Sequence, residues 1–120
     1  MEVVYIKGEA LEQAKLFKIC GITRKHKYLF HIPNGGSRHP IEALNLKLQG
    51  VKPGVPDLFY PFPTPKHYGL FIEMKYGKNK LTEYQKEWID YLNKVGYLAV
   101  VCYSAEDALY ILEKYSNNEV

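Results

Sequence analysis

The sequence predicts a small α/β domain in which helices pack on a short β-sheet. Three observations support this fold class. The chain has 120 residues, the usual size of one domain. Helical and strand patterns alternate along it. Hydrophobic residues make up 47% of the chain, which is ordinary for a globular protein with a buried core. We therefore expect residues 1–120 to form a single domain.

The first half of the chain carries the signals of two helices and two strands. Apolar residues recur at helical spacing in the first segment, and Pro40 suits the first turn of the second helix. Short apolar runs bounded by proline and glycine mark the strands. The expected order is a helix over 9–20 that ends at Gly21, a strand over 28–32, a helix over 40–48 and a strand over 57–60.

The second half predicts two further strands and two further helices. A connection rich in proline, 61–67, leads into the clearest strand of the chain. Thr82 and Gln85 fit a capping box at the start of the next helix. The expected elements are a strand over 69–75, a helix over 82–95, an apolar strand over 97–103 buried on both faces, and a last helix capped by Ser104, with a frayed tail after Tyr115.

Positive charge is concentrated in one part of the sequence. The net charge is only +3, yet residues 13–56 hold eight basic residues against one acidic residue, a block charge of +7. A segregated basic block indicates a polyanionic partner, most often nucleic acid. The alternative is a solvated surface that happens to be rich in lysine.

Several classes of protein are disfavoured by the sequence. No apolar run approaches the roughly 18 residues that a membrane span requires. The first residues lack the basic start and apolar centre of a signal peptide. Two cysteines, Cys20 and Cys102, make neither a disulfide framework nor a four-ligand zinc site. We therefore expect a cytoplasmic protein with free thiols and no membrane partner.

Two carboxylates and an ammonium group are expected at one point of the sheet. Asp57 opens one strand, and Glu73 and Lys75 lie two residues apart on the next, so their side chains share a face. Repulsion between Asp57 and Glu73 requires a compensating cation, and their hard oxygens suit Mg²⁺ or Mn²⁺. Such an ion would activate water against a phosphodiester, with Lys75 holding or deprotonating the water or steadying the phosphate.

An ordinary ion pair is the alternative interpretation of Glu73 and Lys75. It is the better one for an isolated Glu-x-Lys on a strand. The strand over 69–75 is otherwise apolar, however, and burying two charged groups at its end is costly unless they have a function.

The segments 54–57 and 70–75 resemble the PD-(D/E)xK nuclease signature. Their wider context resembles the VRR-NUC family (virus-type replication-repair nuclease) from about residue 9 to about residue 112. The resemblance implies a restriction-endonuclease-like core, with a small mixed β-sheet flanked by α-helices, and a metal-dependent DNA nuclease. The matching stretches are 31–36, 47–57, 73–75, 81–88 and 96–97.

The resemblance also implies roles for individual residues. Asp57 and Glu73 would be metal ligands, together with the backbone carbonyl of Met74. Lys75 would be the catalytic lysine.

A glutamate of the first helix would complete the site in this family. Glu9 is favoured because Gln13 follows it at the family's spacing of four, and Glu12 on the neighbouring row is the alternative. Gln85 also has two interpretations. It caps its helix, or it faces the sheet near the metal-bound water, as its alignment with Trp88 indicates.

Contacts to DNA are expected at two places. A turn of small residues can offer backbone amides to a phosphate, and lysines around the proposed site can bind phosphates. A plain turn and inert exposed lysines are the alternatives. The candidates are Asn34, Gly35, Arg38, Lys52, Lys78 and Lys80.

Together these features predict a stand-alone DNA endonuclease that depends on Mg²⁺ or Mn²⁺. The resemblance favours branched or junction DNA in replication, repair or recombination, and a setting in a bacterial or phage-infected cell. Two cuts across a branch favour a homodimer. The alternatives are a nickase, a flap nuclease or a restriction-like nuclease on the same fold, or a catalytically inactive DNA-binding module.

Overall fold

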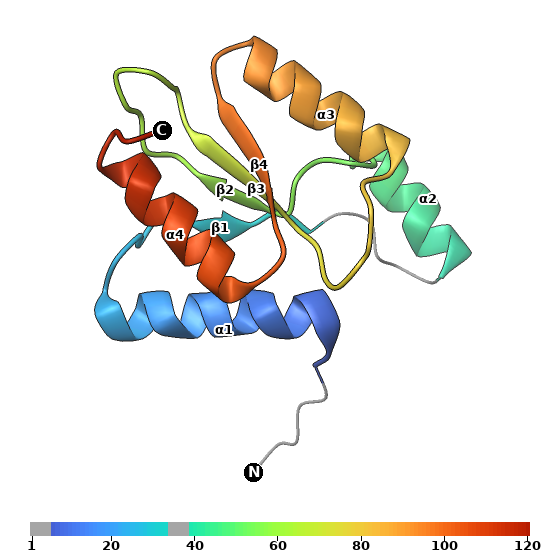
Figure 1. Ribbon diagram of the computed structural model, residues 1–120. Coiled ribbons are helices and arrows are strands. Elements are labelled where there is room, and N and C mark those ends of the chain that lie inside the picture. The colour runs from blue at the N-terminus through green and yellow to red at the C-terminus, as the bar shows by residue number, and fades with distance from the viewer. Residues whose placement is uncertain (1–5, 34–38) are drawn as a thin grey trace.

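The computed structural model describes residues 6–33 and 39–120. Four helices surround one four-stranded sheet (Figure 1), in the order that the sequence predicts, and the α/β fold class is confirmed. Each strand begins and ends within its predicted range. The elements are α1 (Gly8–Thr23), β1 (Phe30–His31), α2 (Pro40–Leu48), β2 (Leu58–Tyr60), β3 (Leu70–Met74), α3 (Glu83–Lys94), β4 (Leu98–Cys102) and α4 (Ala105–Ser116).

The sheet is mixed and its strand order is β1-β2-β3-β4. The β1–β2 and β2–β3 pairs are antiparallel, and β3 pairs with β4 in parallel. The connection 61–67 joins β2 to β3 as neighbours, with Leu58 opposite Ile72. A parallel pair requires a crossover, and α3 provides it between β3 and β4.

The main core lies between the sheet and the two helices α1 and α4 (Figure 1). The side chains of β3 point alternately to the two faces of the sheet. Every second one enters this core, while Phe71 and Glu73 point to the opposite face. Tyr115 is fully buried there, and its hydroxyl donates to the Phe62 carbonyl at 2.7 Å. The β3 residues in the core are Leu70, Ile72 and Met74, all with 0% exposure.

The opposite face of the sheet is aromatic and is covered in part by α3. Phe59 stacks on Phe71 at 4.3 Å between ring centroids, and Phe71 meets Tyr97 edge-on at 5.4 Å. The Asn93 side chain of α3 bonds both backbone groups of Ala99, at 3.1 and 2.9 Å. These bonds satisfy the outer edge of β4 and hold α3 against the sheet.

Three expectations about the elements are wrong. Helix α1 does not end at Gly21 but continues to Thr23, where Arg24 takes the left-handed conformation with φ 58°. Strand β4 is not buried on both faces, because only Ala99 and Cys102 are buried and its other three residues are half-buried. The tail does not fray, because Lys114 pairs with Glu119 at 2.9 Å and Val120 packs against the core.

No helix in the described ranges combines the length and the hydropathy that a membrane span needs.

Candidate active site

Strand pairing brings Asp57 and Glu73 together where β2 starts and β3 ends. Leu58 lies opposite Ile72, so the preceding residue, Asp57, comes opposite Glu73, with both side chains on the face that α3 covers. The Asp57 Oδ2 atom accepts a hydrogen bond from the Met74 backbone N at 2.8 Å. This bond turns the carboxylate across the end of β3. The structure thus assembles the acidic pair that the strand order predicts.

Glu73 is buried, and its surroundings favour its protonated form. Only 2% of the surface of Glu73 is exposed to solvent. Burial raises the pKa of the Glu73 carboxyl to about 9, helped by a hydrogen bond with the Asp57 side chain and by the Asp57 charge. Lys75 acts in the opposite direction but is outweighed. At neutral pH, a proton therefore offsets the repulsion between the two carboxyl groups when no cation is bound.

Lys75 continues β3 beyond Met74 and places a buried ammonium group near the acids. Its backbone N donates to the Cys102 carbonyl at 2.8 Å, which extends the parallel pairing by one residue. The residue is 7% exposed. Its charge lowers the pKa of Glu73 and of Glu9, so it lies within electrostatic reach of both.

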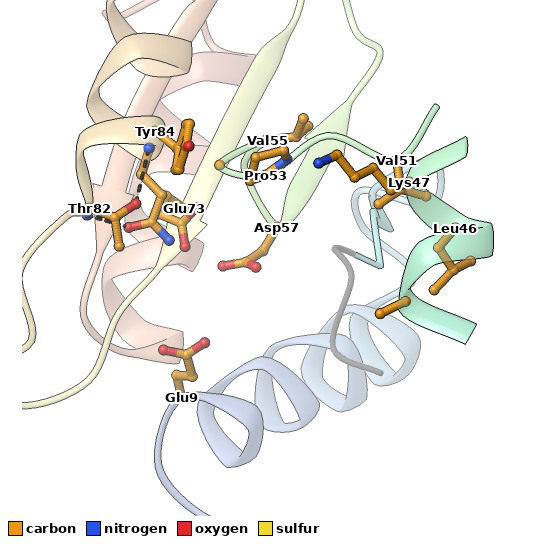
Figure 2. Close-up of a pocket in the computed structure, with 13 residues that line it drawn as sticks. Glu9, Leu46, Lys47, Val51, Pro53, Val55, Asp57, Glu73, Thr82 and Tyr84 are labelled. Atoms are coloured by element: carbon orange, nitrogen blue, oxygen red, sulfur yellow. Dashed lines mark hydrogen bonds between the residues drawn. The ribbon is translucent and has the colours of Figure 1, made fainter. Parts of the chain in front are cut away.

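Glu9 approaches the pair from the first turn of α1. Figure 2 shows its carboxylate directed toward Asp57. Partial burial raises the pKa of Glu9, the Asp57 charge raises it further, and Lys75 lowers it. The ring of Tyr76 lies against the α-carbon of Gly8, since a Cβ there would be 3.3 Å from the Tyr76 Cδ1 atom. This contact helps to fix the start of α1 beside the site.

A pocket of about 580 Å³ opens over these acids (Figure 2). We call it the acidic pocket. It receives Glu9 from α1, the acidic pair from the sheet, Lys47 from α2, and residues from the start of α3. Among its lining residues are Glu9, Lys47, Asp57, Glu73, Tyr84 and Gln85.

Glu12, the alternative to Glu9, has a structural role instead. Its Oε1 atom accepts from the Ala105 backbone N at 3.2 Å, at the start of α4. Its Oε2 atom pairs with Lys15 Nζ at 2.9 Å. Both oxygens are therefore used away from the acidic pocket, and the geometry favours Glu9 as the third carboxylate.

Gln85 caps its helix and also lines the acidic pocket. The capping box is present, because Thr82 N donates to Gln85 Oε1 at 2.9 Å and Gln85 N donates to Thr82 Oγ1 at 3.2 Å. The same side chain lines the acidic pocket. Its carbonyl oxygen is committed to the cap, so its amide group is the part that remains for the pocket.

The donor set fits a hard divalent cation held by few protein ligands. Within the described ranges, no three or more His, Cys, Asp or Glu side chains converge as a metal site, so Glu9 stands back from the pair. Mg²⁺ commonly keeps several waters and takes only one or two carboxylates, which Asp57 and Glu73 can supply. The Met74 N–H faces Asp57, and the carbonyl of a strand residue leaves the same edge as its N–H. The Met74 carbonyl therefore faces the pair as well.

The predicted DNA contacts lie apart from the acidic pocket or outside the described residues. Lys52 is exposed and lines a neighbouring groove. Lys78 and Lys80 are exposed in the turn after β3. None of these three lysines lines the acidic pocket. Asn34, Gly35 and Arg38 lie outside the described residues.

Lys47 and Tyr84 line the acidic pocket without having been singled out from the sequence as site residues. Lys47 belongs to the basic block and to the motif at 47–57, which was the available signal. Tyr84 is next to the loop at Gly54, where φ is +88° and a Cβ would lie 2.5 Å from the Tyr84 backbone carbon. The absence of a side chain at Gly54 therefore allows the loop before Asp57 to pack directly on α3.

The Asp57 backbone is held from the other side by β1. Its carbonyl oxygen accepts from Ile32 N at 2.7 Å and lies 2.9 Å from His31 Nδ1. Asp57 is therefore fixed by β1 through its carbonyl and by β3 through its carboxylate.

Comparison with known proteins supports the resemblance. A family model described as VRR-NUC domain matches residues 18–106. Among solved structures, a "VRR_NUC domain protein" is 29% identical, with a TM-score of 0.79, and the match covers 95% of this chain and 92% of that one. No curated protein matches the chain significantly. The family match contains Asp57, Glu73 and Lys75 and begins after Glu9 and Glu12.

Proposed function

Because the chain belongs to the VRR-NUC family of nucleases, we propose that it is a DNA endonuclease that depends on Mg²⁺ or Mn²⁺. The observation that carries this proposal is the pairing of Asp57 with Glu73 beside the buried Lys75. Two acids and an ammonium group at the end of adjoining strands form a site for hydrolysis of a phosphodiester.

Each residue has a defined task in this proposal. A divalent cation held between the carboxylates would neutralise phosphate charge and acidify an attacking water. Asp57 is oriented by its bond to Met74 N, and Glu73 would release its proton to solvent on holding the cation. Lys75 orients the water and stabilises the charge that develops on the phosphate. The water would attack phosphorus and release a proton to solvent, the bond to the leaving sugar oxygen would break, and that oxygen would take up a proton from solvent.

We further propose that the substrate is branched DNA and that the protein acts as a homodimer. One chain has one acidic pocket and cuts one strand, so two symmetric copies would cut both strands across a branch. Lys47 is placed to bind a phosphate near the site, because its side chain lines the acidic pocket.

The test uses purified protein and labelled four-way, flap and linear duplex DNA, with Mg²⁺, Mn²⁺ or EDTA. We expect cleavage of branched DNA with either metal and none with EDTA. Lys75→Ala and Asp57→Ala should lower cleavage by about 10²-fold or more, since they remove groups that act at the reacting phosphate.

DNA affinity, measured by fluorescence anisotropy, should persist in both variants. Lys66→Ala is the matched control, because Lys66 hydrogen-bonds the Asn118 carbonyl and does not line the acidic pocket. Calorimetry with Mn²⁺ should show a binding heat that Asp57→Ala loses. A Lys75→Ala protein that cuts as fast as the parent would refute the mechanism. A parent protein that binds DNA but does not cut it with either Mg²⁺ or Mn²⁺ would indicate a DNA-binding module.

A further inference from the structure

A second hollow adjoins the acidic pocket along the outer side of α3. It has a volume of about 620 Å³, within the range of sites that bind small organic groups. We call it the aromatic groove. It shares Pro53 and Tyr84 with the acidic pocket, so the two hollows adjoin at these residues. It is lined by Lys52, Pro53, Tyr84, Glu87, Trp88 and Tyr91.

Three aromatic side chains of α3 form one wall of this groove. Tyr84, Trp88 and Tyr91 follow one another at intervals of four and three residues, so they share a helix face. Trp88 and Tyr91 meet edge-on at 6.4 Å. Tyr84 is 59% exposed and Tyr91 is 55% exposed, whereas Leu92 holds the buried side of the helix. The rings of Tyr84 and Tyr91 are therefore accessible, and Trp88 beside them is half-buried.

The lining of the groove includes one basic and one acidic residue, Lys52 and Glu87. Lys52 offers an ammonium group to a phosphate, since its side chain is exposed and belongs to the loop that leads to Asp57. Glu87 repels phosphates from the ring face and can accept hydrogen bonds from the amino group of a base. A flat π-system attached to a phosphate matches this arrangement better than the DNA backbone alone.

We propose that the aromatic groove binds an unpaired nucleobase of the DNA, with Lys52 on its phosphate and the next phosphate directed to the acidic pocket. This inference rests on the proposed nuclease function, since it deepens the substrate choice of the same site. Within a duplex, the faces of a base are covered by its stacked neighbours. A base in a single-stranded segment exposes a face that can stack on Trp88 or Tyr91.

The consequence is a preference for DNA with an unpaired segment next to the cut. Stacking of one base on aromatic side chains changes affinity by about tenfold or more. Fully paired linear DNA lacks this contribution and should bind through phosphates alone.

Trp88 is the single tryptophan of the chain, so its fluorescence reports on the groove directly. The titration is done in EDTA with a single-stranded oligonucleotide and, separately, with a closed, blunt-ended duplex in which every base is paired and which carries the same number of phosphates. We expect the single strand to quench Trp88 emission and the closed duplex to leave it nearly unchanged.

Tyr91→Ala should weaken binding of the single strand by about tenfold, with binding of the closed duplex unaffected, and Tyr91→Phe should restore it. Tyr110→Ala is the matched control, because Tyr110 is a 65% exposed tyrosine on α4. Circular dichroism melts verify that all variants fold.

Equal quenching by both DNA forms, or equal affinities of Tyr91→Ala and Tyr110→Ala, would overturn the groove assignment. Since EDTA is present throughout, this result is independent of catalysis. A protein that shows the expected quenching yet cuts no DNA with metal would refute the nuclease proposal while the base site remains supported.

Discussion

The proton on Glu73 connects the chemistry of a single carboxyl group to the stability of the protein. In the folded, metal-free chain the pKa of Glu73 is raised to about 9 from a reference of 4.5, mainly by burial. The unfolded chain releases this proton at much lower pH. Between these two values the folded state binds more protons than the unfolded state, so stability decreases as pH rises.

We therefore predict that the melting temperature of the metal-free protein decreases as pH rises from about 5 to about 9. Glu73→Gln should remove most of this dependence, because the neutral amide keeps a similar shape without a titrating group. Thermal melts in EDTA at constant ionic strength measure the effect. Glu83→Gln is the control, since the Glu83 side chain is 91% exposed. The same slope in Glu73→Gln and in the parent protein would contradict the prediction.

The loop before β2 shows how one element fixes the position of a site residue in another. It passes α3 at Gly54, where a Cβ would lie 2.5 Å from the Tyr84 backbone, and then delivers Asp57 to the sheet. The capping box of Thr82 and Gln85 fixes the start of the same helix. The position of Asp57 therefore depends on tight packing between the loop and α3.

We predict different effects for alanine at the two glycines of this loop. Gly50 has φ +99° and open space around it, so Gly50→Ala should cost only backbone strain, about 1–2 kcal/mol. Gly54 has φ +88° and a steric conflict in addition, so Gly54→Ala should cost roughly a further 1–3 kcal/mol. Urea unfolding measures both. Cleavage should decrease in Gly54→Ala and persist in Gly50→Ala, and equal losses would argue against the packing role.

At the scale of the whole molecule, ion pairs, one within a helix and one between segments far apart in the chain, reduce the charge that the basic block can offer to a polyanion. Lys15 pairs with Glu12 at 2.9 Å, and Lys25 approaches Glu113 at 3.3 Å. Lys47 instead lines the acidic pocket. We therefore expect position, and not the number of basic residues, to decide which lysines bind phosphate.

We predict that DNA affinity falls linearly with the logarithm of salt concentration. Lys47→Ala should reduce the magnitude of this slope by about one, because one phosphate contact is lost. Lys25→Ala should leave it nearly unchanged, since Lys25 is paired with Glu113 and lies away from the acidic pocket. Anisotropy titrations over a series of KCl concentrations measure the slopes. A flat response to salt would exclude a phosphate-driven interface.

The order of the helices and strands could be predicted from the sequence, as could the acidic pair. Both depend on local periodicity and on the pairing of two strands joined by a short connection. Once β2 and β3 are neighbours, the two-residue repeat of a strand places Asp57 opposite Glu73, and Lys75 on the same face as Glu73. No information about distant parts of the chain is needed for this step.

The packing of helices on the sheet decided which other residues line the acidic pocket. Glu9 and Glu12 lie one turn apart on α1, and they differ only because the start of α4 binds Glu12 while Glu9 is left facing Asp57. Lys47 lines the acidic pocket and Lys78 does not, because α2 contributes to the wall of the pocket and the turn after β3 does not. A pattern along the chain specifies which face a side chain occupies. What that face contacts depends on where other elements end in space, and only the tertiary structure determines this.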